Sequence, residues 1–187
     1  MNEPFRSFDF DPRKLPKPYL EAIGLACACY AQTEDNVQMA ISGILGVDGE
    51  TGWALSTHMT APLRESVLKS LTDIKFDNLD DIEEFDRLMA DVSEAATRRN
   101  RLAHNLWAVD EETGDVYQVS TQARKRVAVD VKPISLKAIR ADAAFIYDAG
   151  IELLRFLMAK NLLPALPSAE RPRFDKRKAI KNKRRKQ

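Results

Sequence analysis

Apolar side chains recur at intervals of three and four residues along three long segments of the chain, the spacing of an amphipathic helix. The first helix is predicted from Tyr19 until Gly46 and Gly49, since glycine commonly ends helices. A loop is expected over residues 47–59, and Thr60 then acts as N-cap of a short second helix. The apolar stripe of the first helix is Leu20, Ile23, Cys27, Tyr30, Val37, Ile41 and Ile44, and that of the second is Leu63, Val67, Leu68 and Leu71.

The third helix is predicted to begin at Asn78 or Asp80, where several acidic side chains match the positive end of the helix dipole. It ends near His104, with Asn105 expected in the left-handed conformation that often closes helices. A charged residue, Arg99, falls within its otherwise apolar stripe of Ile82, Phe85, Met89, Val92, Ala96 and Ala103.

Alternating apolar and polar residues replace the helical spacing between residues 106 and 132. Two such runs flank the glycine-containing segment Asp110–Asp115, which is typical of a hairpin, and residues 126–131 add a third strand. Ser135 then caps a fourth, long helix. The predicted fold is mainly α, a four-helix-bundle-like domain with a small β-hairpin or meander inserted before the last long helix.

The chain divides into three parts on this basis. Residues 1–18, which are rich in proline, form an irregular arm, and residues 19–163 form the helical domain with its β insertion at about 106–132. Residues 164–187 are too poor in apolar side chains to fold alone and are expected to be a disordered basic tail.

Two charged residues interrupt apolar stripes. Arg99 lies in the stripe of the third helix, and Glu34 occupies the matching position in the first. Because burial of an unpaired charge is costly, we predict that Glu34 holds the guanidinium of Arg99 by charge-assisted hydrogen bonds. The alternative is that Glu34 marks a break between two shorter helices and is solvated.

The end of the third helix gathers further polar side chains. Asn100 and His104 are four residues apart and share one edge of the helix. Arg101 lies on the His104 side and is either a solvent-exposed charge or a phosphate contact, whereas Arg98 is off the stripe and is interpreted as a surface charge. His104 also has a simpler interpretation, as an imidazolium at the negative end of the helix dipole. His58 lies in the predicted loop and is interpreted as structural.

Composition excludes several functional classes. No apolar run approaches the roughly 18–20 residues that span a bilayer, and no secretory signal opens the chain. Cys27 and Cys29 point in different directions on a helix, and only two histidines are present, so neither a disulfide framework nor a metal site is expected. No cofactor and a cytoplasmic location are predicted.

Charge is distributed unevenly. From residue 171 onward there are ten basic residues and one acid, about +9, whereas residues 1–170 carry 19 basic and 27 acidic side chains, a net −8. The tail is either solvated and inert, a sequence-independent contact to nucleic-acid phosphates, or an import signal. Its basic residues are Arg171, Arg173, Lys176, Arg177, Lys178, Lys181, Lys183, Arg184, Arg185 and Lys186.

The motif Arg99-Asn100-x-x-x-His104 resembles that of the HEPN superfamily, small helical domains with an Arg, a polar residue and a His near the end of the third helix. The resemblance covers about residues 17–162, including an acidic residue in the first helix. Many relatives have Gly where this chain has Asn105. The β insertion and the basic tail are not part of the minimal domain.

The resemblance implies metal-independent RNA cleavage through the ribose 2′-hydroxyl, as in a toxin or defence component. His104 is then the general base or the general acid, and Arg99 binds the scissile phosphate. Asn100 orients either the His104 imidazole or the phosphate. It also implies a homodimer with facing motifs, and a cognate antitoxin or regulatory protein as a partner. The alternatives are a non-catalytic HEPN-like interaction or RNA-binding module, or an inert helical body that binds nucleic acid through its tail.

Overall fold

The computed structural model describes residues 7–122 and 128–165, so the ten basic tail residues lie outside the described part of the chain. Its architecture is mainly helical with a small antiparallel sheet, as the sequence predicts. The elements are, in order, β1 (Phe8–Asp9), η1 (Pro12–Lys14), α1 (Lys17–Leu45), α2 (Gly49–Ser56), α3 (Ala61–Lys75), α4 (Leu79–His104), β2 (Leu106–Asp110), β3 (Val116–Gln122), β4 (Ala128–Pro133) and α5 (Leu136–Ala159).

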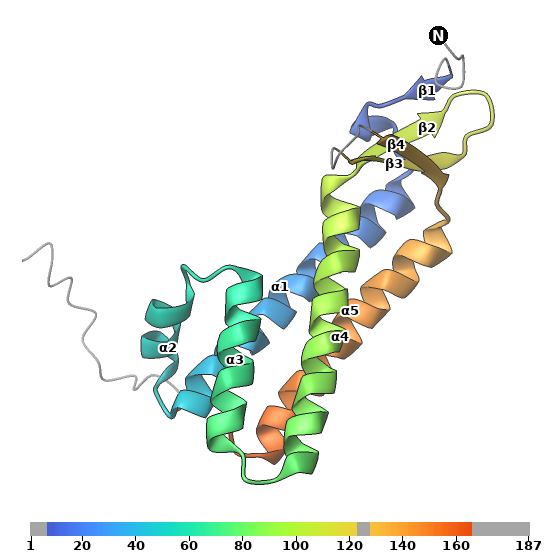
Figure 1. Cartoon of the computed structure of the whole chain (residues 1–187). Coiled ribbons are helices and arrows are strands. Elements are labelled where there is room, and N and C mark those ends of the chain that lie inside the picture. The colour runs from blue at the N-terminus through green and yellow to red at the C-terminus, as the bar shows by residue number, and fades with distance from the viewer. Residues whose placement is uncertain (1–6, 123–127, 166–187) are drawn as a thin grey trace, which may run out of the picture.

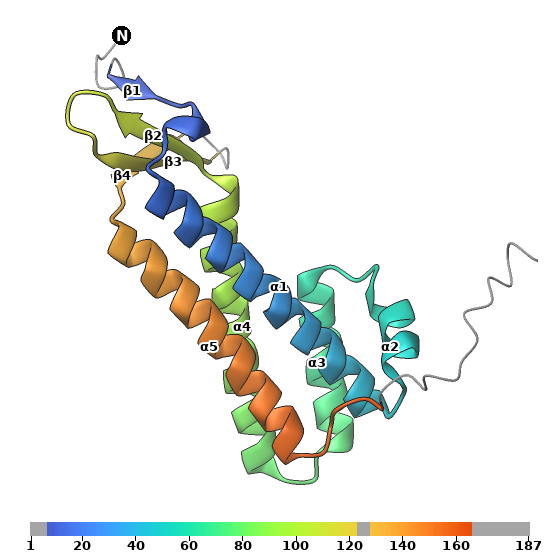
Figure 2. The ribbon, with the colours of Figure 1, turned by 180° about the vertical axis from the view of Figure 1, so that it is seen from behind.

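Three long helices, α1, α4 and α5, lie side by side and make up the body of the molecule (Figure 1). The sheet covers the end of this body where α1 and α5 begin and α4 ends. The shorter helices α2 and α3 lie beside the other half of α1, as the reverse view shows (Figure 2). Two of the three N-caps predicted for the helices are formed: Asn78 Oδ1 accepts a hydrogen bond from the Asp80 amide at 3.0 Å, and Ser135 Oγ accepts one from the Ala138 amide at 3.2 Å.

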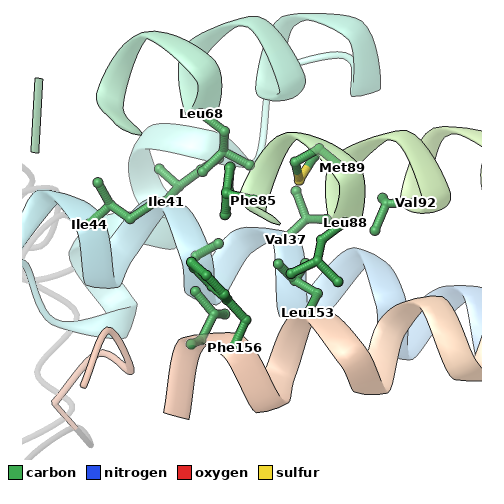
Figure 3. Close-up of a cluster of buried hydrophobic side chains, with 12 residues drawn as sticks. Val37, Ile41, Ile44, Leu68, Phe85, Leu88, Met89, Val92, Leu153 and Phe156 are labelled. Carbon is green, nitrogen blue, oxygen red and sulfur yellow. The ribbon is translucent and has the colours of Figure 1, made fainter. Parts of the chain in front are cut away.

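The core at the α3 end of the body joins four helices. Figure 3 shows Val37 and Ile41 of α1, Leu68 of α3, Phe85 of α4 and Phe156 of α5 converging on one cluster. Burial of each such side chain stabilises the fold by about 1.5–3 kcal/mol. This cluster fixes α3 against α1 and α4, which is where the cleft described below opens.

Helices α1 and α5 approach closely at Gly150, where a Cβ atom would lie 2.5 Å from Thr33 Oγ1. Two buried polar side chains of α1 use this approach. Thr33 Oγ1 lies within hydrogen-bond distance of the Ile146 carbonyl at 3.2 Å and of the Cys29 carbonyl of its own helix at 3.1 Å, and Asn36 Nδ2 donates to the Gly150 carbonyl at 2.9 Å. Since buried polar groups are costly unless hydrogen-bonded, these contacts select one rotation of α1 against α5.

The sheet has the strand order β1-β2-β3-β4, and all its neighbours are antiparallel. It also anchors the end of α4, whose last carbonyls lack partners within the helix. Trp107 Nε1 donates to the Leu102 carbonyl at 3.1 Å, and Gln118 Nε2 donates to the Arg101 carbonyl at 2.9 Å. The β insertion therefore fixes the helix end that carries the Arg99–His104 motif.

The loop predicted over residues 47–59 contains a fifth helix, α2, which the sequence analysis missed. Gly46 closes α1 with φ +70°, as predicted, but Gly49 begins α2 and does not close α1. Asp48 is the N-cap and accepts from the Thr51 amide at 3.0 Å. The helix has only eight residues, too few for the apolar periodicity on which the prediction relied.

Other differences are local. Asn105 is extended (φ −76°, ψ 153°) and not left-handed, because the chain passes directly from α4 into β2. The N-terminal half of α1 buries Ala22 and Ala26 and leaves Leu20 43% exposed, so its inner face is rotated from the predicted stripe. The arm predicted to be irregular contributes β1, which pairs with β2.

Gly43 of α1 provides a test of the packing around the end of α5. Its added Cβ would lie 1.5 Å from the Leu162 carbonyl oxygen, so we expect Gly43→Ala to lower the free energy of unfolding by about 1–3 kcal/mol. Gly24, in the same helix, has no atom within 4 Å of an added Cβ, and Gly24→Ala should raise it by about 0.5–1 kcal/mol. Chemical denaturation measures both, and equal shifts would contradict the packing.

Candidate functional site

Arg99 lies on the buried side of α4, between Ala95 and Leu102, but its side chain keeps 25% of its surface exposed. The guanidinium carbon is 4.4 Å from the centre of the Tyr30 ring, and Nη2 is 3.8 Å from Glu34 Oε2. The predicted pairing of Glu34 with Arg99 is present. The alternative, a helix break at Glu34, is wrong because α1 is continuous from Lys17 to Leu45.

The pair is looser than predicted. A separation of 3.8 Å is a Coulombic contact beyond hydrogen-bond range, and the Glu34 carboxylate accepts no hydrogen bond from the described residues. Arg99 Nη1 instead donates to Asn100 Oδ1 at 2.9 Å. Arg99 is therefore held by its contact with the Tyr30 ring, its hydrogen bond to Asn100 and a long ion pair with Glu34. The carboxylate oxygens of Glu34 can still accept hydrogen bonds.

Arg64, at the start of α3, is a second cationic partner of Glu34 that the sequence analysis missed. Its Nη1 is 3.7 Å from Glu34 Oε1, and its side chain is only 13% exposed. Its Nε is shielded from solvent and has no hydrogen-bond acceptor in the described part of the chain. Arg64 lies one turn before Leu68, which is fully buried, whereas Leu63 of the predicted stripe is 49% exposed, so the face of α3 that is turned to the core differs from the predicted one.

Glu34 and Arg64 line a cleft of about 190 Å³ between α1, α3 and α4. Its lining is mostly apolar, and each of the three helices also contributes polar side chains. Asn100 lines the cleft, while His104, Arg101 and Arg99 do not. The lining residues are Tyr30, Thr33, Glu34, Val37, Ala61, Pro62, Arg64, Glu65, Met89, Val92, Ser93, Ala96, Thr97 and Asn100.

His104 is the last residue of α4 and is exposed. Its imidazole makes no hydrogen bond or ion pair with any residue in the described ranges. Helical geometry places it one turn beyond Asn100 on the same edge, about 6 Å further along the axis. The structure thus brings Glu34, Arg99 and Asn100 into contact and leaves the imidazole free to meet a ligand.

Arg101 and Arg98 belong to a separate cluster around Asp142 of α5. Arg101 Nη2 is 2.6 Å and Arg98 Nη1 3.4 Å from the Asp142 carboxylate, whose side chain is 9% exposed. The Arg98 guanidinium also stacks 3.9 Å from the centre of the Phe145 ring. The interpretation of Arg98 as an ordinary surface charge is therefore wrong, and Arg101 supports the α4–α5 contact.

The Tyr30 hydroxyl is the group of the site whose ionisation is perturbed. Its burial raises its pKa, and the nearby Glu34 carboxylate raises that pKa further, while the two guanidinium groups oppose both effects. Tyr30 is therefore neutral at physiological pH and presents its ring face to Arg99.

Within residues 7–122 and 128–165, no group of three or more His, Cys, Asp or Glu side chains is placed to hold a metal ion. None of the helices in these ranges combines the length and apolar character needed to cross a membrane. No family model, curated protein or solved structure matches the chain significantly.

The Asp142 cluster is expected to be structural. Asp142→Asn removes the charge that holds two guanidinium groups, and we expect it to lower the free energy of unfolding by about 1–2 kcal/mol, since water reaches both arginines. Asp91→Asn is the matched control, because Asp91 pairs with Arg87 on the exposed face of α4, where such a pair contributes at most about 0.5 kcal/mol. Urea denaturation distinguishes the two, and equal losses would contradict this role.

Tyr30 should make stability fall at alkaline pH. Because its folded pKa is raised, the folded state holds the proton more tightly than the unfolded chain, so this contribution is complete below about pH 10 and declines above it by at most about 1.4 kcal/mol per pH unit. Tyr30→Phe should lessen this decline and leave the part that comes from Cys29, whose pKa burial also raises. Tyr147→Phe, at a 47% exposed position, is the matched control. Denaturation from about pH 9 to 11 checks both, and an unchanged decline in Tyr30→Phe would contradict the assignment.

Proposed function

We propose that this chain is a HEPN-like, metal-independent endoribonuclease, with Arg99, Asn100 and His104 as its catalytic residues. One observation carries the proposal. A partly exposed arginine is held by a neighbouring helix without being hydrogen-bonded to its acidic partner, and two exposed polar residues, Asn100 and His104, follow it along the same helix end.

The chemistry requires no group beyond the chain and its RNA. A base takes the proton of the ribose 2′-hydroxyl, whose oxygen attacks the adjacent phosphorus, and the 5′-oxygen leaves with a proton from an acid. The products are a 2′,3′-cyclic phosphate and a 5′-hydroxyl. Arg99 offsets charge on the phosphate oxygens, and His104 carries one of the two proton transfers.

The second proton transfer favours a homodimer. Each chain supplies one imidazole at the motif, so two copies with facing motifs supply both an acid and a base. In this proposal the basic tail, residues 171–186, adds sequence-independent contacts to RNA phosphates. A cytoplasmic toxin or defence role, with a cognate antitoxin or regulatory protein, belongs to the same proposal.

A non-catalytic interaction or RNA-binding module is the second candidate. It is favoured by the contacts of Arg99, which lie within the chain and also serve stability, and by the absence of a partner that orients His104 among the described residues. The net charge of −8 over residues 1–170 also disfavours RNA approach to the body.

The nuclease is tested by incubating the purified chain with structured RNA in EDTA. We expect cleavage with 2′,3′-cyclic phosphate ends, reduced about 10²- to 10⁴-fold in His104→Ala and about 10²- to 10³-fold in Arg99→Ala. His58→Ala is the control, because His58 is the other histidine of the chain and is exposed after α2.

Thermal melting of each variant separates chemistry from folding. Loss of cleavage with an unchanged melting temperature supports the catalytic assignment of His104. Intact RNA with folded wild-type protein at high concentration contradicts the nuclease and favours the binding module.

A further inference from the structure

The cleft between α1, α3 and α4 has the size and lining of a site for one small flat molecule. Its volume of about 190 Å³ is below the roughly 300–1,000 Å³ of pockets for drug-sized ligands. Val37, Met89, Val92 and Ala96 supply apolar walls from two helices, and Pro62 adds another from α3. A planar ring with apolar faces suits such walls.

The polar side chains that line the cleft include an acceptor, Glu34, whose Oε1 lies 3.7 Å from a donor, Arg64 Nη1. The Glu34 carboxylate accepts no hydrogen bond, and the Arg64 guanidinium donates none, within the described part of the chain. A buried guanidinium in this condition costs free energy that a ligand can recover. The ligand edge that matches this pair carries N–H donors facing Glu34 and an acceptor facing Arg64.

Guanine matches this pattern better than the other bases of RNA. Its N1–H and N2–H₂ groups lie side by side and can donate to both oxygens of one carboxylate, and its O6 accepts from a guanidinium. Adenine and cytosine offer a carboxylate only their exocyclic amino group, and uracil offers only one ring N–H.

We propose that this cleft binds a guanine base of RNA, with Glu34 and Arg64 reading its edge. The link to cleavage rests on the proposed function. Since Asn100 is at the cleft and His104 one turn beyond it, the phosphate on the 3′ side of the bound guanosine lies along the Asn100–His104 edge, and the hydrogen bond from Arg99 Nη1 to Asn100 Oδ1 keeps the guanidinium near that edge. Hydrogen bonds to guanine also occupy the carboxylate that faces Arg99, which makes the Arg99 guanidinium available to that phosphate.

Binding is measured by calorimetry on the full chain with guanosine, adenosine, cytidine and uridine 3′-monophosphates. We expect guanosine 3′-monophosphate to bind at least about tenfold more tightly than the others, and Glu34→Gln to abolish this preference. Glu65→Gln is the matched control, because Glu65 also lines the cleft but pairs with Lys69 at 3.1 Å. Ala96→Leu, which fills the cleft and leaves Glu34 in place, should also abolish binding. This second variant tests the site even if Glu34→Gln does not fold.

An uncleavable 2′-O-methyl oligonucleotide with one guanine distinguishes RNA from a free nucleotide. Tighter binding of the oligonucleotide than of the mononucleotide supports RNA as the occupant, and equal binding overturns that assignment. Equal affinity for all four mononucleotides, or none, overturns the guanine site even if RNA is cleaved at every base. Guanine-specific binding without cleavage retains the site and contradicts the nuclease.

Discussion

The close contact of α1 with α5 at Gly150 determines the direction of the side chains that α1 contributes to the site. Thr33 and Asn36 can donate to the carbonyls of α5 only in one rotation of α1, and Gly150 leaves no room for another. Residues three and four apart are neighbours on a helix surface, so this rotation also places Tyr30 and Glu34 beside the part of α4 that carries Arg99. The position of Arg99 over the Tyr30 ring therefore depends on the packing of α1 against α5.

Two carboxylates among the described residues, Asp142 and Glu34, each face two guanidinium groups, but at different distances and with different exposure. Asp142 is 9% exposed and accepts from Arg101 at 2.6 Å, a closed ion pair that joins α4 to α5. Glu34 is 37% exposed, borders a cleft, and stays 3.7 and 3.8 Å from its partners. The acceptor positions of Asp142 are therefore used in holding α4 against α5. Glu34 can exchange partners without its own charge becoming buried and unpaired, because water already reaches its carboxylate.

The limits of prediction follow from the range of each interaction. Caps at Asn78 and Ser135 depend on residues two or three positions away, and the pairing of Glu34 with Arg99 was visible because each charge interrupts an apolar stripe. Arg64 and Asp142 were missed because their importance comes from other helices: α3 reaches Glu34 only after the chain turns back. The prediction of a left-handed Asn105 was wrong for a similar reason. The pairing of β2 in the sheet overrides the local preference of Asn105 for the left-handed region.

The sheet bears on the simplest explanation of His104, a cation at the negative end of a helix dipole. That negative end consists of carbonyls without partners, and two of them here, of Arg101 and Leu102, accept hydrogen bonds from Gln118 and Trp107. A positive charge on His104 therefore stabilises this helix end less than it would stabilise a frayed one. The same two bonds hold the last turn of α4 in a fixed position, with His104 exposed. The dipole interpretation of His104 is therefore weaker here than at a helix end whose last carbonyls lack such donors.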